Sequence, residues 1–124
     1  METPDLSPDQ RAALVTQAAT ALFAWQKVGN ASQIAHARLL MAWALARTGD
    51  GATATHLAGQ AWDVLKDGAL WERAFALAAR AAAADAANDP EYPARHAQAA
   101  RAGAALSEDE AQMFRASFDR IRVP

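Results

Sequence analysis

Hydrophobic side chains recur along this chain at intervals of three and four residues, and no segment alternates apolar and polar positions with a period of two. Intervals of three and four place side chains on one face of an α-helix, whereas alternation is typical of a half-buried strand. The pattern therefore predicts an all-α fold without a sheet. Clusters of Gly, Pro, Asn and Asp divide it into about six helices. We expect the first from residue 8 to the stop "VGN" at 28–30, and the others over residues 31–48, 51–66, 69–87, 93–105 and 107–121.

Residues with capping side chains mark the expected helix starts. Ser7 is followed by Pro8, and Ser107 is followed three residues later by Glu110; both arrangements are typical of the first turn of a helix. For the fifth helix we favour a start near Pro93, because a proline deeper inside the helix would clash with the preceding turn.

The segments between the expected helices are only a few residues long, so consecutive helices should pack as antiparallel neighbours. The whole chain of 124 residues is of the size that encloses one hydrophobic core. We therefore expect a single domain over residues 1–124. Residues 1–6 are expected to form a flexible N-terminus, and residues 107–121 a helix that caps the C-terminal end of the array.

The segment "TGDG" at residues 48–51 is expected to be a turn between two helices. Gly49 can end the first helix with a positive φ, and Asp50 can cap the start of the second. The alternative is an anion site at the start of the second helix. A phosphate-binding P-loop would require Gly-Lys-Ser/Thr here, and the following "GATATH" does not provide it.

Composition narrows the classes of function. Alanine accounts for 36 of the 124 residues, so the hydrophobic content of 52% overstates the area available for burial. The formal net charge of −2, from 12 basic and 14 acidic residues, gives no electrostatic bias toward nucleic acid or an anionic membrane. The chain has no cysteine, which excludes disulfides, zinc–thiolate sites and thiol nucleophiles.

The N-terminal sequence "METPDLSPDQ" has neither the basic region nor the apolar region of a signal peptide. No apolar stretch of membrane-spanning length occurs without charged residues. We therefore expect a soluble, cytoplasmic protein.

The residues that could carry chemistry do not form a recognised motif. His36, His56 and His96 are not spaced as metal ligands, and no Gly-x-Ser-x-Gly segment occurs. The acidic cluster Glu108–Glu110 is expected at an exposed helix start, where nothing would raise its pKa values. We therefore expect no catalytic activity, no cofactor and no metal site.

The tryptophans can be interpreted in two ways. They compensate for the small side chains of the core, or they anchor a partner, since tryptophan and arginine lead the hot spots of interfaces. Trp43 and Arg47 are four residues apart and share a helix face, as do Trp71 and Phe75. The four tryptophans are Trp25, Trp43, Trp62 and Trp71.

The sequence contains a weak internal repeat. A shift of 39 residues places Asp50 on Asp89 and superimposes more alanines than the composition predicts. Small residues at matching positions let the helices of a hairpin approach closely, and stacked hairpins share one core. The superimposed pairs are Ala35/Ala74, Ala37/Ala76, Ala42/Ala81, Ala44/Ala83, Ala58/Ala97 and Ala61/Ala100.

This pattern resembles the tetratricopeptide-repeat (TPR) group of helical hairpins, and in particular the C-terminal part of small bacterial TPR-like proteins. The candidate repeats are residues 31–66 and 70–105. The second copy departs from the TPR pattern, with Asn88 in place of glycine, Pro93 in place of a small residue, and a repeat longer than the usual 34 residues. The residues that carry the resemblance are Ala42, Gly49, Asp50, Ala54, Ala58 and Ala61, and then Ala81, Asn88, Asp89, Ala97 and Ala100.

The resemblance implies a right-handed α–α superhelix in which the first helix of each hairpin lines a concave surface. It further implies an interaction module that binds a peptide or a partner helix in the concave groove. Two alternatives remain: a homodimer that buries the alanine-rich halves of the fourth and fifth helices, and a small-ligand or metal pocket that uses His36 or Asp85. The residues that we expect on the concave face are His36, Leu39, Trp43, Arg47, Phe75 and Asp85.

Overall fold

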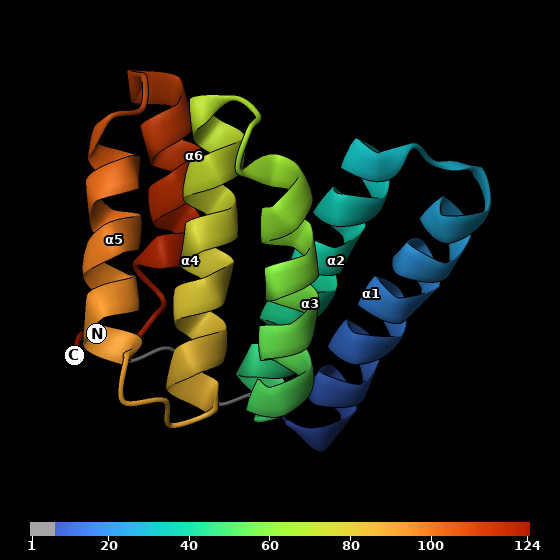
Figure 1. The fold of residues 1–124 in the computed structure, drawn as a ribbon. Helices are drawn as coiled ribbons and strands as arrows, with labels where there is room; N and C mark the ends of the chain where they lie inside the picture. Colours follow the sequence, from blue (N-terminus) through green and yellow to red (C-terminus); the bar gives the residue numbers. More distant parts are fainter. Residues whose placement is uncertain (1–6) are drawn as a thin grey trace.

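Six α-helices and no strand make up the part of the chain that the computed structural model describes, residues 7–124 (Figure 1). The all-α fold and the number of helices are as predicted, and the expected flexible segment 1–6 lies outside the described residues. The helices are α1 (Pro8–Val28), α2 (Ala31–Thr48), α3 (Gly51–Leu65), α4 (Leu70–Ala86), α5 (Tyr92–Ala104) and α6 (Glu108–Phe118).

The capping residues define the helix starts as the sequence predicted. The Ser7 hydroxyl accepts a hydrogen bond from the Gln10 amide, and the Ser7 amide donates one to the Gln10 side chain. Pro93 lies in the first turn of α5. The predicted extent of the last helix was wrong: α6 ends at Phe118, and tighter turns lead from there to Ile121, which is buried against the core.

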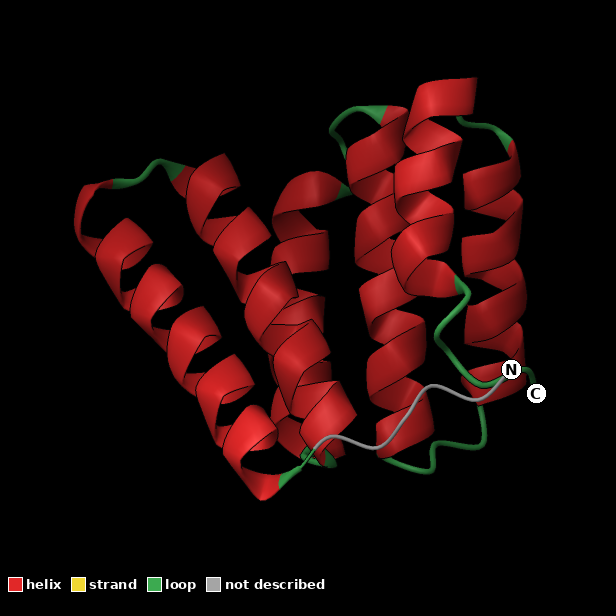
Figure 2. Cartoon of the chain, turned by 180° about the vertical axis from the view of Figure 1, so that it is seen from behind, coloured by secondary structure: helices red, strands yellow, loops and turns green. Residues whose placement is uncertain are grey.

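The helices form two layers. The odd-numbered helices run in one direction and the even-numbered helices in the other (Figures 1 and 2). In the even layer α4 contacts both α2 and α6, whereas the described residues give no contact among α1, α3 and α5 of the odd layer. Among the described helices, contacts within one layer therefore occur only in the even layer, and all other contacts join the two layers. Helix α1 packs mainly against α2 and has no buried residue.

Helix α4 is the centre of the structure, because it packs against α2, α3, α5 and α6. Its small side chains allow this close packing from all sides. The alanines of α4 are buried inside the chain itself, so they offer no surface for the suggested homodimer. A homodimer stays a prediction. Its nine buried residues are Ala74, Ala76, Leu77, Ala78, Ala79, Ala81, Ala82, Ala83 and Ala84.

The corner at residues 48–51 is a turn, and a second corner repeats its geometry. Gly49 has a φ of 94° and Asn88 a φ of 55°, so both occupy the left-handed region. The Asp50 amide donates to the carbonyl of residue 45, and the Asp89 amide donates to the carbonyl of residue 84, both at 2.9 Å. Because the Asp50 carboxylate accepts the Thr53 amide at 3.1 Å, an anion is already present at the start of α3.

The alanine repeat is correct for the first helix of each hairpin and wrong for the second. The four pairs between α2 and α4 are buried in both copies. In contrast, Ala58 and Ala61 of α3 are buried, whereas Ala97 and Ala100 of α5 are exposed. The buried residues of α5 match those of α3 at a shift of 38, as in the pairs Ala54/Tyr92, Ala61/Ala99 and Leu65/Gly103. The connection 87–91 is longer than the two residues between α2 and α3. The buried face of α5 is displaced by one residue from the face that the repeat of 39 residues predicted.

Gly51 provides a test of how closely the corner at residues 48–51 packs against the corner that follows α4. A Cβ atom at Gly51 would overlap backbone atoms of Ala86 and Ala87, whereas one at Gly59, also in α3, would meet nothing within 4 Å. We expect Gly51→Ala to lower the free energy of unfolding by about 1–3 kcal/mol. The control Gly59→Ala should raise it by up to about 1 kcal/mol, since alanine is the better helix former. Urea denaturation measures both, and equal stability of the two variants would contradict the close contact.

Candidate functional site

A cleft with a volume of about 720 Å³ opens on the side of the even layer. Helix α4 forms its floor, since α4 contacts α2 and α6 while those two do not contact each other. Figure 2 looks onto this side of the molecule. The lining residues are Arg11 and Leu14 of α1, His36, Leu39, Leu40, Trp43, Ala44, Ala46 and Arg47 of α2, Trp71, Phe75, Ala82, Asp85 and Ala86 of α4, and Ser117, Arg120, Ile121 and Arg122 from the end of the chain.

The structure brings together all the residues that the sequence assigned to the concave face. They come from α2 and α4, which run parallel because α3 connects them. Their role in binding stays a prediction. The six residues in the cleft are His36, Leu39, Trp43, Arg47, Phe75 and Asp85.

Aromatic rings occupy the end of the cleft near the starts of α2 and α4. The His36 ring lies 5.3 Å from Trp71, and Trp71 meets the edge of Phe75 with 6.2 Å between centroids. Phe75 in turn contacts Phe114 of α6 edge to face, at 5.9 Å. Edge-to-face pairs of this kind stabilise beyond the area they bury, so the row ties α2, α4 and α6 together.

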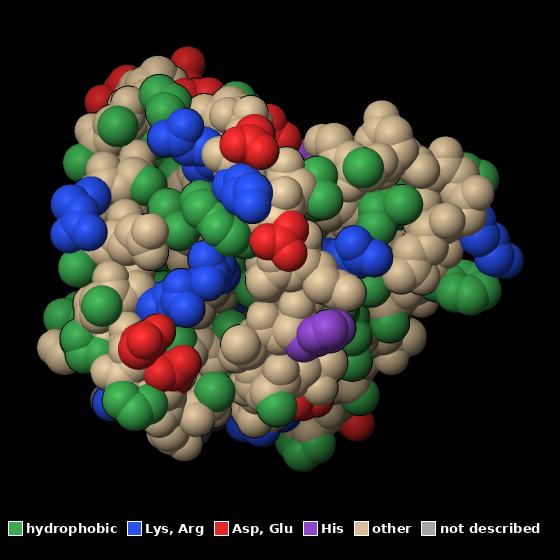
Figure 3. Space-filling model, viewed as in Figure 1, with side chains coloured by type: hydrophobic (Ala, Val, Ile, Leu, Met, Phe, Trp, Pro, Cys, Tyr) green, Lys and Arg blue, Asp and Glu red, His purple; other side chains and the backbone are tan. Residues whose placement is uncertain are grey.

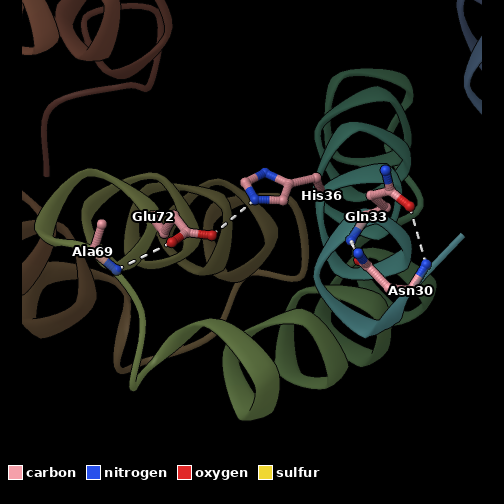
Figure 4. A network of polar contacts seen from close by, with 5 residues as sticks. All are labelled: Asn30, Gln33, His36, Ala69 and Glu72. Atoms are coloured by element: carbon pink, nitrogen blue, oxygen red, sulfur yellow. Dashed lines mark hydrogen bonds and ion pairs between the residues drawn. The ribbon is translucent and has the colours of Figure 1, made fainter.

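A polar bridge connects α2 and α4 at the end of the cleft where the aromatic rings lie (Figure 4). His36 Nε2 lies 2.9 Å from Glu72 Oε2, and Glu72 Oε1 accepts the Ala69 amide at 3.0 Å. The hydrogen bond from Ala69 is the main cause that lowers the pKa of Glu72; burial opposes it and His36 adds to it. Glu72 therefore caps α4, where Ala69 offers no capping side chain, and fixes the His36 ring.

An ion pair between residues far apart in sequence closes the opposite end. Arg122 donates from Nη2 and Nε to Asp85 Oδ1, at 2.7 and 3.1 Å. The hydrogen bond from Arg122 to Asp85 raises the pKa of Arg122. The pair fixes the residues after α6 against the last turn of α4, so Asp85 is not an open acid of the cleft.

Tyr92 packs below this ion pair. The Arg122 guanidinium lies over the Tyr92 ring, 5.7 Å from its centroid. Burial, followed by the nearby Asp85 charge, raises the pKa of Tyr92 to about 12. Tyr92 is therefore neutral at physiological pH and acts as a packing residue.

The charges of the cleft gather at one end. Helices α2, α4 and α6 all end there and α1 begins there, so the four arginines, which lie near these helix ends, line the same end of the cleft. Among the lining residues that the structure describes, Asp85 is the one carboxylate, and it is paired. Basic side chains therefore outnumber acidic ones among these described residues, although the whole chain has a net charge of −2. Its arginines are Arg11, Arg47, Arg120 and Arg122.

The face formed by α3, α4 and α5 differs from the cleft. Figure 3 shows basic and acidic side chains next to each other on it, without a large area of one sign. Trp62 packs there against Arg80, whose guanidinium lies 5.6 Å from the ring centroid. Burial lowers the pKa of Arg80.

The interpretation of the tryptophans as core residues is wrong for two of the four. Trp25 is 40% exposed and Trp71 is 37% exposed, while Trp43 and Trp62 are partly buried. Trp71 lines the cleft, as its helical spacing to Phe75 could have indicated. The sequence analysis also missed the part of the cleft that Arg120 and Arg122 line. The last helix was expected to continue to residue 121, whereas α6 ends at Phe118, before both arginines.

Neither a cluster of metal ligands nor a membrane-spanning helix occurs in the described part of the chain. Residues 7–124 contain no group of three His, Asp or Glu side chains that could hold a metal ion. No helix among them has both the length and the apolar character needed to cross a membrane.

No protein-family model, no curated protein and no solved structure matches this chain. Membership of the TPR group therefore stays a prediction. The function has to be argued from the geometry and the charge of the cleft.

The bridge between His36 and Glu72 should appear in the pH dependence of stability. A carboxyl group whose pKa is lowered in the folded state stabilises the protein above its ordinary pKa of 4.5, and this contribution is lost as the pH falls through the folded-state pKa. We therefore expect the stability advantage of the wild type over Glu72→Gln to shrink between about pH 5 and pH 3. Denaturation at a series of pH values measures it.

A second pair of variants separates the causes. Because the Ala69 amide is the main cause of the shift, the advantage should shrink in the same way when His36→Gln is compared with His36→Gln/Glu72→Gln. An advantage that stays constant or grows below pH 4.5 would show that Glu72 has no lowered pKa.

Proposed function

We propose that this protein is an interaction module that binds a peptide segment of a partner protein in the cleft between α2, α4 and the end of the chain. It carries out no reaction of its own. The observation that supports this most is a cleft with many apolar lining residues and with large apolar side chains exposed at its rim. A volume of about 720 Å³ lies within the usual range of binding clefts.

The exposed side chains at the rim are the ones that a partner would cover. Leu40 is 61% exposed and Trp71 is 37% exposed, and both line the cleft. Contiguous apolar surface rimmed by polar residues is typical of interaction sites. Trp71 and Arg47 are also of the residue types that dominate interface energetics.

We further propose that the stack is TPR-like, with residues 31–66 and 70–105 as its hairpins. Two observations support the proposal. The corners at Gly49 and Asn88 share one hydrogen-bond pattern. Among the described helices, contacts within a layer occur only between α2 and α4 and between α4 and α6. The right-handed twist of such a stack stays a prediction.

Leu40 offers a test that leaves the core intact. The wild type is panned against displayed random peptides of twelve residues, and enriched peptides are synthesised with a fluorescent label. We expect Leu40→Ser to weaken their binding about tenfold, or ~1.4 kcal/mol. Fluorescence anisotropy measures the affinity.

Leu70→Ser is the matched control, since Leu70 is 52% exposed on α4 and lies outside the cleft. Its affinity should equal that of the wild type. Both replacements are at the surface and should change stability by no more than about 0.5 kcal/mol. If no peptide is enriched, or if both variants bind alike, the cleft is not the binding site.

A further inference from the structure

We infer that the cleft selects an acidic segment, and that Arg47 and Arg120 are the residues that determine this specificity. The inference rests on the proposed function, because it names the chemistry of the peptide that the same cleft would hold. It starts from Arg47 and Arg120, which line the cleft and form no ion pair with residues 7–124.

These two arginines have no carboxylate of their own among residues 7–124. Arg122 is paired with Asp85, and the other ion pairs of the described residues are His36–Glu72 and Arg95–Glu91. Neither Arg47 nor Arg120 takes part in one. A neutral peptide that covered their guanidinium groups would remove them from water without compensation, which is costly. A carboxylate compensates each group and can bind it in a bidentate manner.

The positions of the side chains also give the segment a direction. Arg47 lies in the last turn of α2, at the end where Arg120 follows α6, whereas His36 and Trp71 lie toward the opposite end. His36 and Arg47 are eleven positions apart, which corresponds to about 16 Å along the helix at 1.5 Å per residue. About five residues of extended peptide cover that length. We therefore expect an apolar side chain over the rings and acidic side chains near the arginines.

A nucleic acid fits the same surface less well. Nucleic acid binding requires a positive groove that follows the phosphate backbone. Here the cations gather at one end of the cleft, the rest of the cleft is apolar, and the chain as a whole has a net charge of −2. The arrangement therefore favours an acidic stretch of a protein.

The experiment compares the peptides that different variants select. The wild type, Arg47→Glu/Arg120→Glu and Arg47→Gln/Arg120→Gln are panned against the same library of random twelve-residue peptides. The control is Arg101→Glu/Arg115→Glu, which changes the net charge by the same amount at two exposed positions outside the cleft. Circular dichroism and thermal unfolding verify that each variant is folded.

We expect peptides selected on the wild type and on the control to contain at least twice as many Asp and Glu residues as the library. The glutamine variant should lose this excess, and the glutamate variant should select Lys and Arg instead. The affinity of a labelled acidic peptide should fall at least tenfold in the glutamate variant and less than twofold in the control.

The outcomes separate this inference from the proposed function. Enriched peptides without an acidic excess, or an acidic excess that persists in the glutamate variant, would overturn the inference while peptide binding stands. Failure to enrich any peptide would overturn both. Binding of a labelled fifteen-residue oligothymidine more tightly than the best acidic peptide would overturn the choice of a protein partner.

Discussion

Alanine side chains separate the helices at the centre of this protein, and the remaining structure depends on how closely they let those helices approach. Ala42, Ala58, Ala61 and Ala81 have no exposed surface, and α4 is enclosed by four other helices. A methyl group buries little area, so stability has to come from many close contacts rather than from a few large side chains. The two corners also pack closely against each other, since a Cβ atom at Gly51 would overlap backbone atoms of Ala86 and Ala87.

The cleft is a consequence of this packing. Trp43 and Phe75 are partly buried against the alanine-rich core and line the cleft on the side of the even layer, and Trp71 lines it beside them. Helix α4 is the floor because α2 and α6 pack on both sides of it. The two ends are then closed by different chemistry: rings and the bridge from His36 to Glu72 at one end, and the pair of Asp85 with Arg122 at the other.

The parts of the fold that depend on local chemistry could be predicted from the sequence. Capping side chains and residues that accept a positive φ act within one turn, so the helix starts and both corners were predicted closely. The rotation of α5 could not be predicted, because a difference of one residue in register moves every side chain by about 100° around the helix. The residues after Phe118 that line the cleft are held by the ion pair of Arg122 with Asp85, which are 37 residues apart, and no local pattern indicates this pair. The six residues that were expected on the concave face all come from α2 and α4 and line the cleft, whereas Trp71, Arg120 and Arg122 were missed.

The most direct measurement of the alanine packing is the change in the free energy of unfolding for Ala61→Leu and Ala100→Leu. The two positions are equivalent in the sequence repeat, but the structure buries Ala61 completely and exposes Ala100. The account predicts a loss of about 1–3 kcal/mol or more for Ala61→Leu, because the added side chain would push α3 away from its neighbours. It predicts a change within about 0.5 kcal/mol for Ala100→Leu. Equal effects at the two positions would contradict it.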